Sequence, residues 1–154
     1  MSINFKGFRV IYVIAAFLMS AVPVFAMNQD QAMVGSISGQ AEFQKAGSAD
    51  WQKLEMDAIL SEGDSIKTAP GSEVTLTLMG AAKTAEIVVR ESSQFVFKTF
   101  QHDDAAIDTT LLDVSLGAVL VKAEKLAGDS RFEVKTPTSI VGIRGTMFEV
   151  KVGS

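Results

Sequence analysis

Cysteine is absent from this chain, so it forms no disulfide, offers no thiolate to a metal and has no cysteine nucleophile. Histidine occurs once, at His102, so a second imidazole is not available for a metal site or for acid–base work. Asp103 and Asp104 follow it, but adjacent residues on a loop seldom converge on one ion. We therefore expect 102–104 to be a solvated loop and the protein to be no enzyme, without cofactor or metal. A hydrolase using paired carboxylates is the remote alternative.

A basic cluster is also missing, while the first 26 residues differ from the rest. Lys6 and Arg9 precede an uninterrupted apolar run, and Pro23 comes shortly before a small-residue end at Ala26. This layout is typical of a secretory signal peptide, here residues 1–26. The alternative is an uncleaved anchor, because residues 10–27 are about 18 long, the lower edge of a membrane span. We expect a periplasmic or secreted protein that meets the membrane only through residues 10–26, if these are retained.

Export changes the charge balance. Removing Lys6 and Arg9 leaves 12 of the 14 basic residues against 18 acidic ones, a net charge of −6. This gives no electrostatic reason to bind nucleic acid or an anionic membrane. An apolar content of 47% is enough for a packed core, and the length fits one domain.

Most of the remaining chain alternates apolar and polar residues with a period of two, which is typical of strands with one buried face. The clearest case is residues 73–79, which follow a Pro70-Gly71 turn signal. Turn signals recur at about 8–12-residue spacing, which predicts about eight or nine short strands, with breaks at 91–93 and at Gly117. The fold class is therefore all-β, and a β-solenoid or roll and a sandwich both remain open.

One arginine stands between two glycines near the end of the chain, in "TPTSIVGIRGTMFEV". Pro137 pushes the preceding residue toward an extended conformation and ends or redirects the strand. Gly142 and Gly145 permit positive φ or close backbone approach. A buried Arg144 needs a carboxylate such as Asp64 or Glu91. We prefer this clamp to an exposed arginine that binds a ligand, and expect Arg144→Ala to cost a few kcal/mol, on the order of an unpaired buried charge.

Trp51 is the only tryptophan, and it lies between polar residues. It is the candidate for surface binding, as an exposed platform for sugar or peptide. We favour the alternative, in which it caps the open end of a small β core.

Several stretches together resemble the FecR domain family, over roughly residues 33–152. The two most specific family elements are G-D-x-I-x-T and T-P-x-x-x-x-G-x-R-G-T-x-F-x-V. They fall here on Gly63, Asp64, Thr68, Thr136, Pro137, Gly142, Arg144, Gly145, Thr146 and Phe148. Two departures occur: a D-G-S hairpin is replaced by "LMGAAKTAEI", and Asp57 stands about where the family has a glycine.

The resemblance implies an extracytoplasmic, β-rich module without catalysis. The best-known relatives are iron-uptake regulators, which pass a signal from an outer-membrane transporter to a cytoplasmic sigma factor. They carry an anti-sigma region before their membrane helix, and only nine residues precede the apolar run here. We therefore expect the isolated domain, which binds an envelope protein or a cell-wall polymer, its oligomeric state left open. The alternative is an accessory component of such a sigma-linked signalling system.

Overall fold

The computed structural model describes residues 31–79, 85–102, 108–123, 131–143 and 146–153. These residues contain strands and turns, which confirms the all-β prediction. Twelve strands are formed: β1 (Gln31–Ser38), β2 (Ala41–Gln44), β3 (Gln52–Lys53), β4 (Ile59–Leu60), β5 (Ser65–Thr68), β6 (Glu73–Met79), β7 (Ala85–Val89), β8 (Gln94–His102), β9 (Asp108–Ala123), β10 (Arg131–Lys135), β11 (Ile140–Ile143) and β12 (Thr146–Val152).

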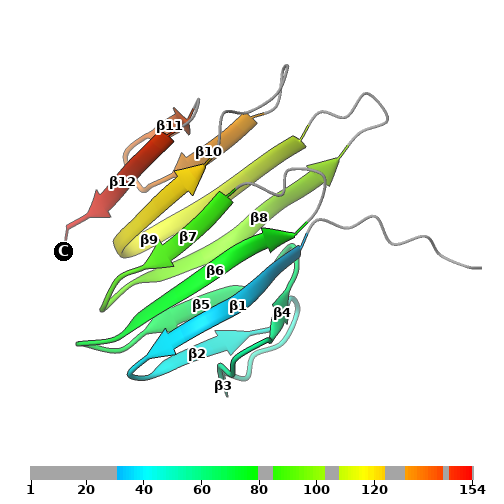
Figure 1. Ribbon diagram of the computed structural model, residues 1–154, viewed down its shortest axis with the longest axis vertical. Coiled ribbons are helices and arrows are strands. Elements are labelled where there is room, and N and C mark those ends of the chain that lie inside the picture. The colour runs from blue at the N-terminus through cyan, green and yellow to red at the C-terminus, as the bar shows by residue number, and fades with distance from the viewer. Residues whose placement is uncertain (1–30, 80–84, 103–107, 124–130, 144–145, 154) are drawn as a thin grey trace, which may run out of the picture.

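All twelve strands belong to one hydrogen-bonded sheet that curls over on itself (Figure 1). Its first layer has the order β4-β1-β6-β7-β9-β12, and its second layer has the order β3-β2-β5-β8-β9-β10-β11. Strand β9 belongs to both layers. Its first part pairs with β8 and β10, and its second part pairs with β7 and β12. Neighbouring strands are antiparallel except β9 and β10, which are parallel.

The two layers are joined along one side of the sheet, where the chain crosses from one layer to the other four times (Figure 1). We call this side the corner. These crossings are Gly39–Gln40, residues 69–72, residues 90–93 and Gly117. The expected turn at Pro70-Gly71 and the expected break at 91–93 are both present. At Gly117 the prediction of a break is wrong. Strand β9 continues through this residue, which takes a φ of 85° and bends the strand from one layer into the other.

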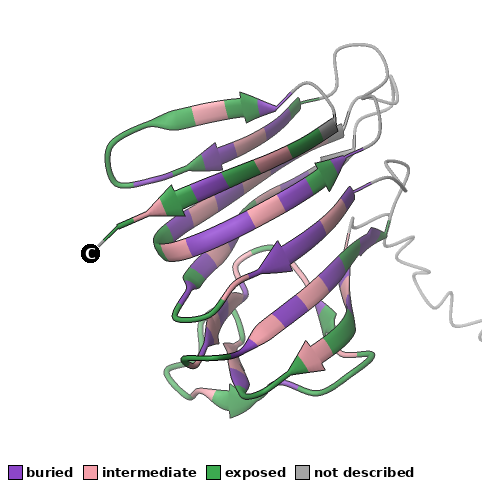
Figure 2. Cartoon of the chain, turned by 60° about the vertical axis from the view of Figure 1, so that its left-hand side comes forward, coloured by how far each residue is buried: buried purple, intermediate pink, exposed green. Residues whose placement is uncertain are grey.

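The core lies between the two layers and forms one cluster of buried apolar side chains. Period-two alternation puts these side chains inside and leaves their neighbours half-buried or exposed, as the bands in Figure 2 show. Phe95 and Phe97 are fully buried and meet edge to face, with ring centroids 5.0 Å apart, and Phe100 stands 4.7 Å from Phe97. These three phenylalanines are the aromatic centre of the core.

The structure has more strands than the eight or nine expected. Strands β3 and β4 have two residues each and are too short to show a periodicity. Strand β8 also extends to His102, the first residue of the stretch expected to be a loop. Within the described ranges there is no helix of the length and apolarity needed to cross a bilayer. The expected signal peptide lies outside the described residues.

Candidate functional site

Asp64 is a buried carboxylate that holds three segments together. It is 2% exposed. One of its oxygens accepts a hydrogen bond from the Ala46 amide at 2.9 Å. The other accepts from the Ser61 amide at 3.0 Å and from the Lys45 ammonium at 2.7 Å. A buried carboxylate is tolerated only when its lone pairs are filled in this way. Asp64 therefore fixes the ends of β2 and β4 against the start of β5.

Gly63, directly before it, has a φ of 86°, and a Cβ there would stand 2.7 Å from the Cβ of Ala46. Only glycine meets both conditions. The G-D pair of the family motif thus has a structural reason at each position.

Two buried serines fill the corner between the layers, each against a glycine. The Ser93 hydroxyl accepts from the Ala118 amide at 2.9 Å, and a Cβ on Gly117 would stand 2.2 Å from that hydroxyl. The Ser72 hydroxyl accepts from the Gln40 amide at 2.9 Å, and a Cβ on Gly39 would stand 2.3 Å from it. The two pairs have the same arrangement, so the corner is built from a repeated serine–glycine unit.

Thr68 links adjacent crossings of the corner. Its hydroxyl donates to the Arg90 carbonyl at 2.6 Å and accepts from the Ser93 amide at 3.0 Å. The hydroxyls of Thr68, Ser72 and Ser93 each accept a hydrogen bond from a backbone amide at this sharp bend, as buried polar groups require. Sequence reasoning found Thr68 through the family motif but gave no role to Ser72, Ser93 or Gly39. Their signal is a small hydroxyl residue at the end of a strand, which is too common to single out.

The turn after β10 is organised by Thr136. Its hydroxyl donates to the Ser139 carbonyl at 3.1 Å and accepts from the Ser139 amide at 3.1 Å, while its own amide donates to that carbonyl at 2.8 Å. Pro137 follows as an exposed turn residue, and β10 ends before it at Lys135, as predicted.

Gly142 differs from expectation. It lies within β11, is absent from the positive-φ positions, and a Cβ there would meet no atom within 4 Å. Gly142 therefore uses neither the positive φ nor the close backbone approach that a glycine permits. Phe148 is half-buried against the core and Thr146 begins β12. Arg144 and Gly145 lie outside the described residues, so the predicted arginine clamp stays a prediction.

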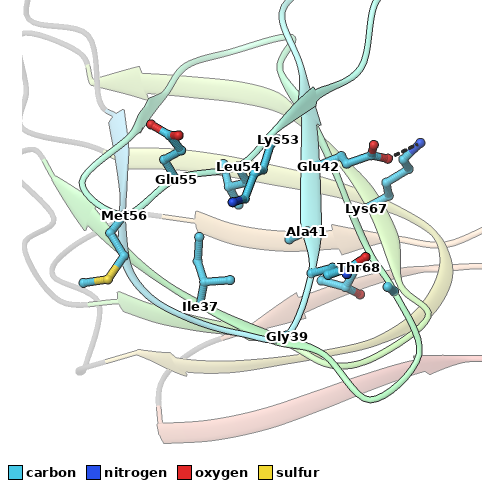
Figure 3. A pocket seen from close by; sticks show the side chains of 12 residues that line it. Ile37, Gly39, Ala41, Glu42, Lys53, Leu54, Glu55, Met56, Lys67 and Thr68 are labelled. Carbon is cyan, nitrogen blue, oxygen red and sulfur yellow. Dashed lines mark ion pairs between the residues drawn. The ribbon is translucent and has the colours of Figure 1, made fainter.

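A groove of about 1020 Å³ lies at the β3 end of the second layer (Figure 3). Its apolar lining includes Ile37, the buried Ala41 and Leu54, and Met56, which is 61% exposed. Its charged residues are two acids and two bases: Glu42, Glu55, Lys53 and Lys67. Apolar side chains and charges of both signs therefore line the same groove.

Trp51 stands beside this groove, directly before β3. It is half-buried, and the Lys67 ammonium lies 4.3 Å from the centre of its ring. The same ammonium pairs with Glu42 at 2.6 Å. One face of the indole is therefore covered by a cation. Its role in surface binding stays a prediction.

The described residues bring no metal site together. No group of three or more His, Cys, Asp or Glu side chains gathers within the described ranges. His102 ends β8, while its side chain, Asp103 and Asp104 lie outside the description. In the described part of the chain, the buried polar side chains at the corner and the turns brace the fold.

The fold and these contacts define a small all-β domain whose polar interior is structural and whose groove is at the surface. Among family models, that of the FecR protein matches residues 64–154. The chain belongs to the FecR family, and the resemblance drawn from its motifs is confirmed. Searches of curated proteins and of solved structures found no match.

Proposed function

We propose that this protein is an exported, non-catalytic interaction module of the bacterial envelope, and that its groove binds a partner polypeptide. The observation that carries the proposal is the groove itself. It combines apolar side chains with two acids and two bases and lies beside the only tryptophan. Apolar side chains of an extended peptide would pack on Ile37 and Met56, and its charged or polar groups would meet the charged side chains around them.

The charged side chains support a peptide over an anionic cell-wall polymer. Glu42 lies opposite Lys53 in the β2–β3 pairing and opposite Lys67 in the β2–β5 pairing. The acids offset the bases across this surface, so a polymer of uniform charge gains little net attraction. The cell-wall polymer is the competing ligand in the test.

Met56→Asp tests the groove, because a 61% exposed side chain can change without loss of the core. Wild-type protein immobilised on beads should retain an envelope protein, and Met56→Asp should retain at least about tenfold less, the effect of losing one good apolar contact. Met79→Asp is the matched control, since Met79 is an exposed methionine on β6, 42% accessible. It should retain as much as wild type.

Sedimentation with purified cell wall runs in parallel. Co-sedimentation that Met56→Asp abolishes would replace the peptide with the polymer as ligand. Equal capture by wild type and Met56→Asp, or no capture of either ligand at micromolar protein, would overturn the proposal.

A second candidate function rests on membership of the FecR family. As an accessory component of a sigma-linked signalling system, the protein would change target transcripts when deleted. Unchanged transcripts under iron limitation and envelope stress would count against this role.

A further inference from the structure

Strand β12 is an open edge of the first layer. It pairs with β9 along its whole length, and no strand of the described ranges pairs with its other side. It has seven residues and no proline, and Met147 on it is 65% exposed. An edge of this length presents a row of backbone amides and carbonyls that can pair with another strand.

A row of charges crosses the outer face of this layer and stops at the same edge. Arg90 forms an ion pair with Glu73, and its guanidinium also lies 3.8 Å from Glu149 on β12. The signs along the row alternate as negative, positive, negative. The next position beyond the open edge would suit a positive charge. Lys151 is exposed on the same face of β12, two residues after Glu149.

We propose that β12 pairs antiparallel with β12 of a second copy of this chain, in a register centred on Val150. In that register Glu149 of each copy lies directly opposite Lys151 of the other, so two ion pairs form across the two-fold axis. In each copy, Lys151 of the other copy then follows Glu149 as the next charge in the row, with the positive sign that continues the alternation. Opposite charges facing each other across antiparallel strands are favourable, and like charges are unfavourable.

The charges also select against the neighbouring symmetric register. If the pairing were centred on Glu149, two carboxylates would face each other and Lys151 would face Met147. On the core side, the Val150 register places Phe148 opposite Val152 of the other copy. Phe148 and Val152 are only half-buried within a single copy, so this contact would bury the exposed parts of both side chains.

The second layer ends at the same side of the molecule. Strand β11 pairs only with β10 among the described strands, and Ile140 at its start is 62% exposed. A two-fold axis normal to the first layer keeps both second layers on the same side of the pair. Strand β11 of one copy then faces β11 of the other, and Figure 1 shows β11 beside β12 at this end. A strand from an unrelated protein could also form hydrogen bonds with the free amides and carbonyls of β12. It would not bring the lysine that faces Glu149 or the second β11 that faces β11.

Charge reversal tests the register. The processed protein recovered after export is studied by sedimentation velocity from micromolar to several hundred micromolar. Wild type should dimerise with rising concentration. Glu149→Lys alone and Lys151→Glu alone should each raise the dissociation constant about tenfold or more, because two opposite-charge pairs become like-charge pairs. The double variant should recover most of the wild-type affinity, because the pairing is restored with exchanged signs.

Lys122→Glu is the matched control. Lys122 is exposed on β9, one strand in from the edge, and pairs with Glu86 at 2.5 Å. It should leave the dimer unchanged, and melting curves should show every variant folded. A monomer at all concentrations would overturn the proposal, as would a dimer indifferent to both single reversals or one that the double variant does not restore. The groove lies at the other end of the sheet, so Met56→Asp should dimerise normally whether or not the groove binds a peptide.

Discussion

The two ends of the curled sheet are finished in different ways. At one end the edge strands β3 and β4 have two residues each, and the segment between them crosses from the second layer to the first. At the other end β12 has seven residues, with no partner on its outer side among the described strands. Figure 1 shows these ends at opposite extremes of the long axis.

The crossing segment is bound to the sheet it covers. The Leu54 amide donates to the Ala41 carbonyl at 2.9 Å, and the Asp57 amide donates to the Val34 carbonyl at 2.9 Å. Leu54 is 2% exposed and inserts into the core, while Met147 and Ile140 at the other end are more than half exposed. Short strands and a covering segment are how proteins block unwanted strand pairing. One end of the sheet is therefore covered by its own chain, whereas the edge strand at the other end has no outer partner among the described strands.

The largest expected effect comes from removing the Asp64 carboxylate, which holds β2, β4 and β5 together at the end of the sheet that contains β3 and β4. Asp64→Ala should lower the free energy of unfolding by about 3–4 kcal/mol, because two amides lose their buried acceptor and the half-exposed Lys45 ammonium loses its partner. Denaturant unfolding measures this. Asp113→Ala is the control toward the open end, where a surface pair with Lys135 at 3.2 Å should be worth no more than about 1 kcal/mol. Equal losses would contradict the contrast between the ends.

Leu54→Ala and Met147→Ala compare the contribution of one apolar side chain at each end of the sheet. Leu54→Ala should cost about 3 kcal/mol, because it leaves a cavity between the layers. Met147→Ala should stay within about 0.5 kcal/mol, as surface changes do. Thermal melts at low protein concentration, where any dimer has dissociated, give both values. A large loss for Met147→Ala under those conditions would show that the second end is covered within a single copy.

The smallest expected effect is a gain. Asp57 lies in the crossing segment with a φ of 61°, a conformation that glycine adopts without strain. Asp57→Gly should raise the free energy of unfolding by about 0.5–1 kcal/mol. Ser92→Gly, at a φ of 51° in the corner, should act in the same direction. A loss of stability for Asp57→Gly would mean that its side chain contributes more than its backbone costs.

Local sequence signals predicted much of the fold. Strand β6 was read from its alternation, and the turns at Pro70-Gly71 and Thr136-Pro137 from the fixed geometry of proline and glycine. The family resemblance also marked Asp57 as standing where a glycine is expected, and its positive φ is the physical counterpart of that departure.

Long-range features were not predictable in this way. The roles of Ser93 and Ser72 depend on glycines brought close by the fold, because the serine–glycine pairs are 24 and 33 positions apart. The bend at Gly117 looks like a strand end to any local pattern, since glycine weakens a strand in either case. The groove arises from three segments that meet only after the sheet has curled.

The passage of β9 from one layer to the other has a consequence for cooperativity. This strand pairs with β8 and β10 before Gly117 and with β7 and β12 after it. Unfolding of either layer therefore disrupts β9, which is also a hydrogen-bonded strand of the other layer. The layers should lose their hydrogen-exchange protection together, as one foldon, and the loss of β12 alone should be the mildest opening that the sheet permits.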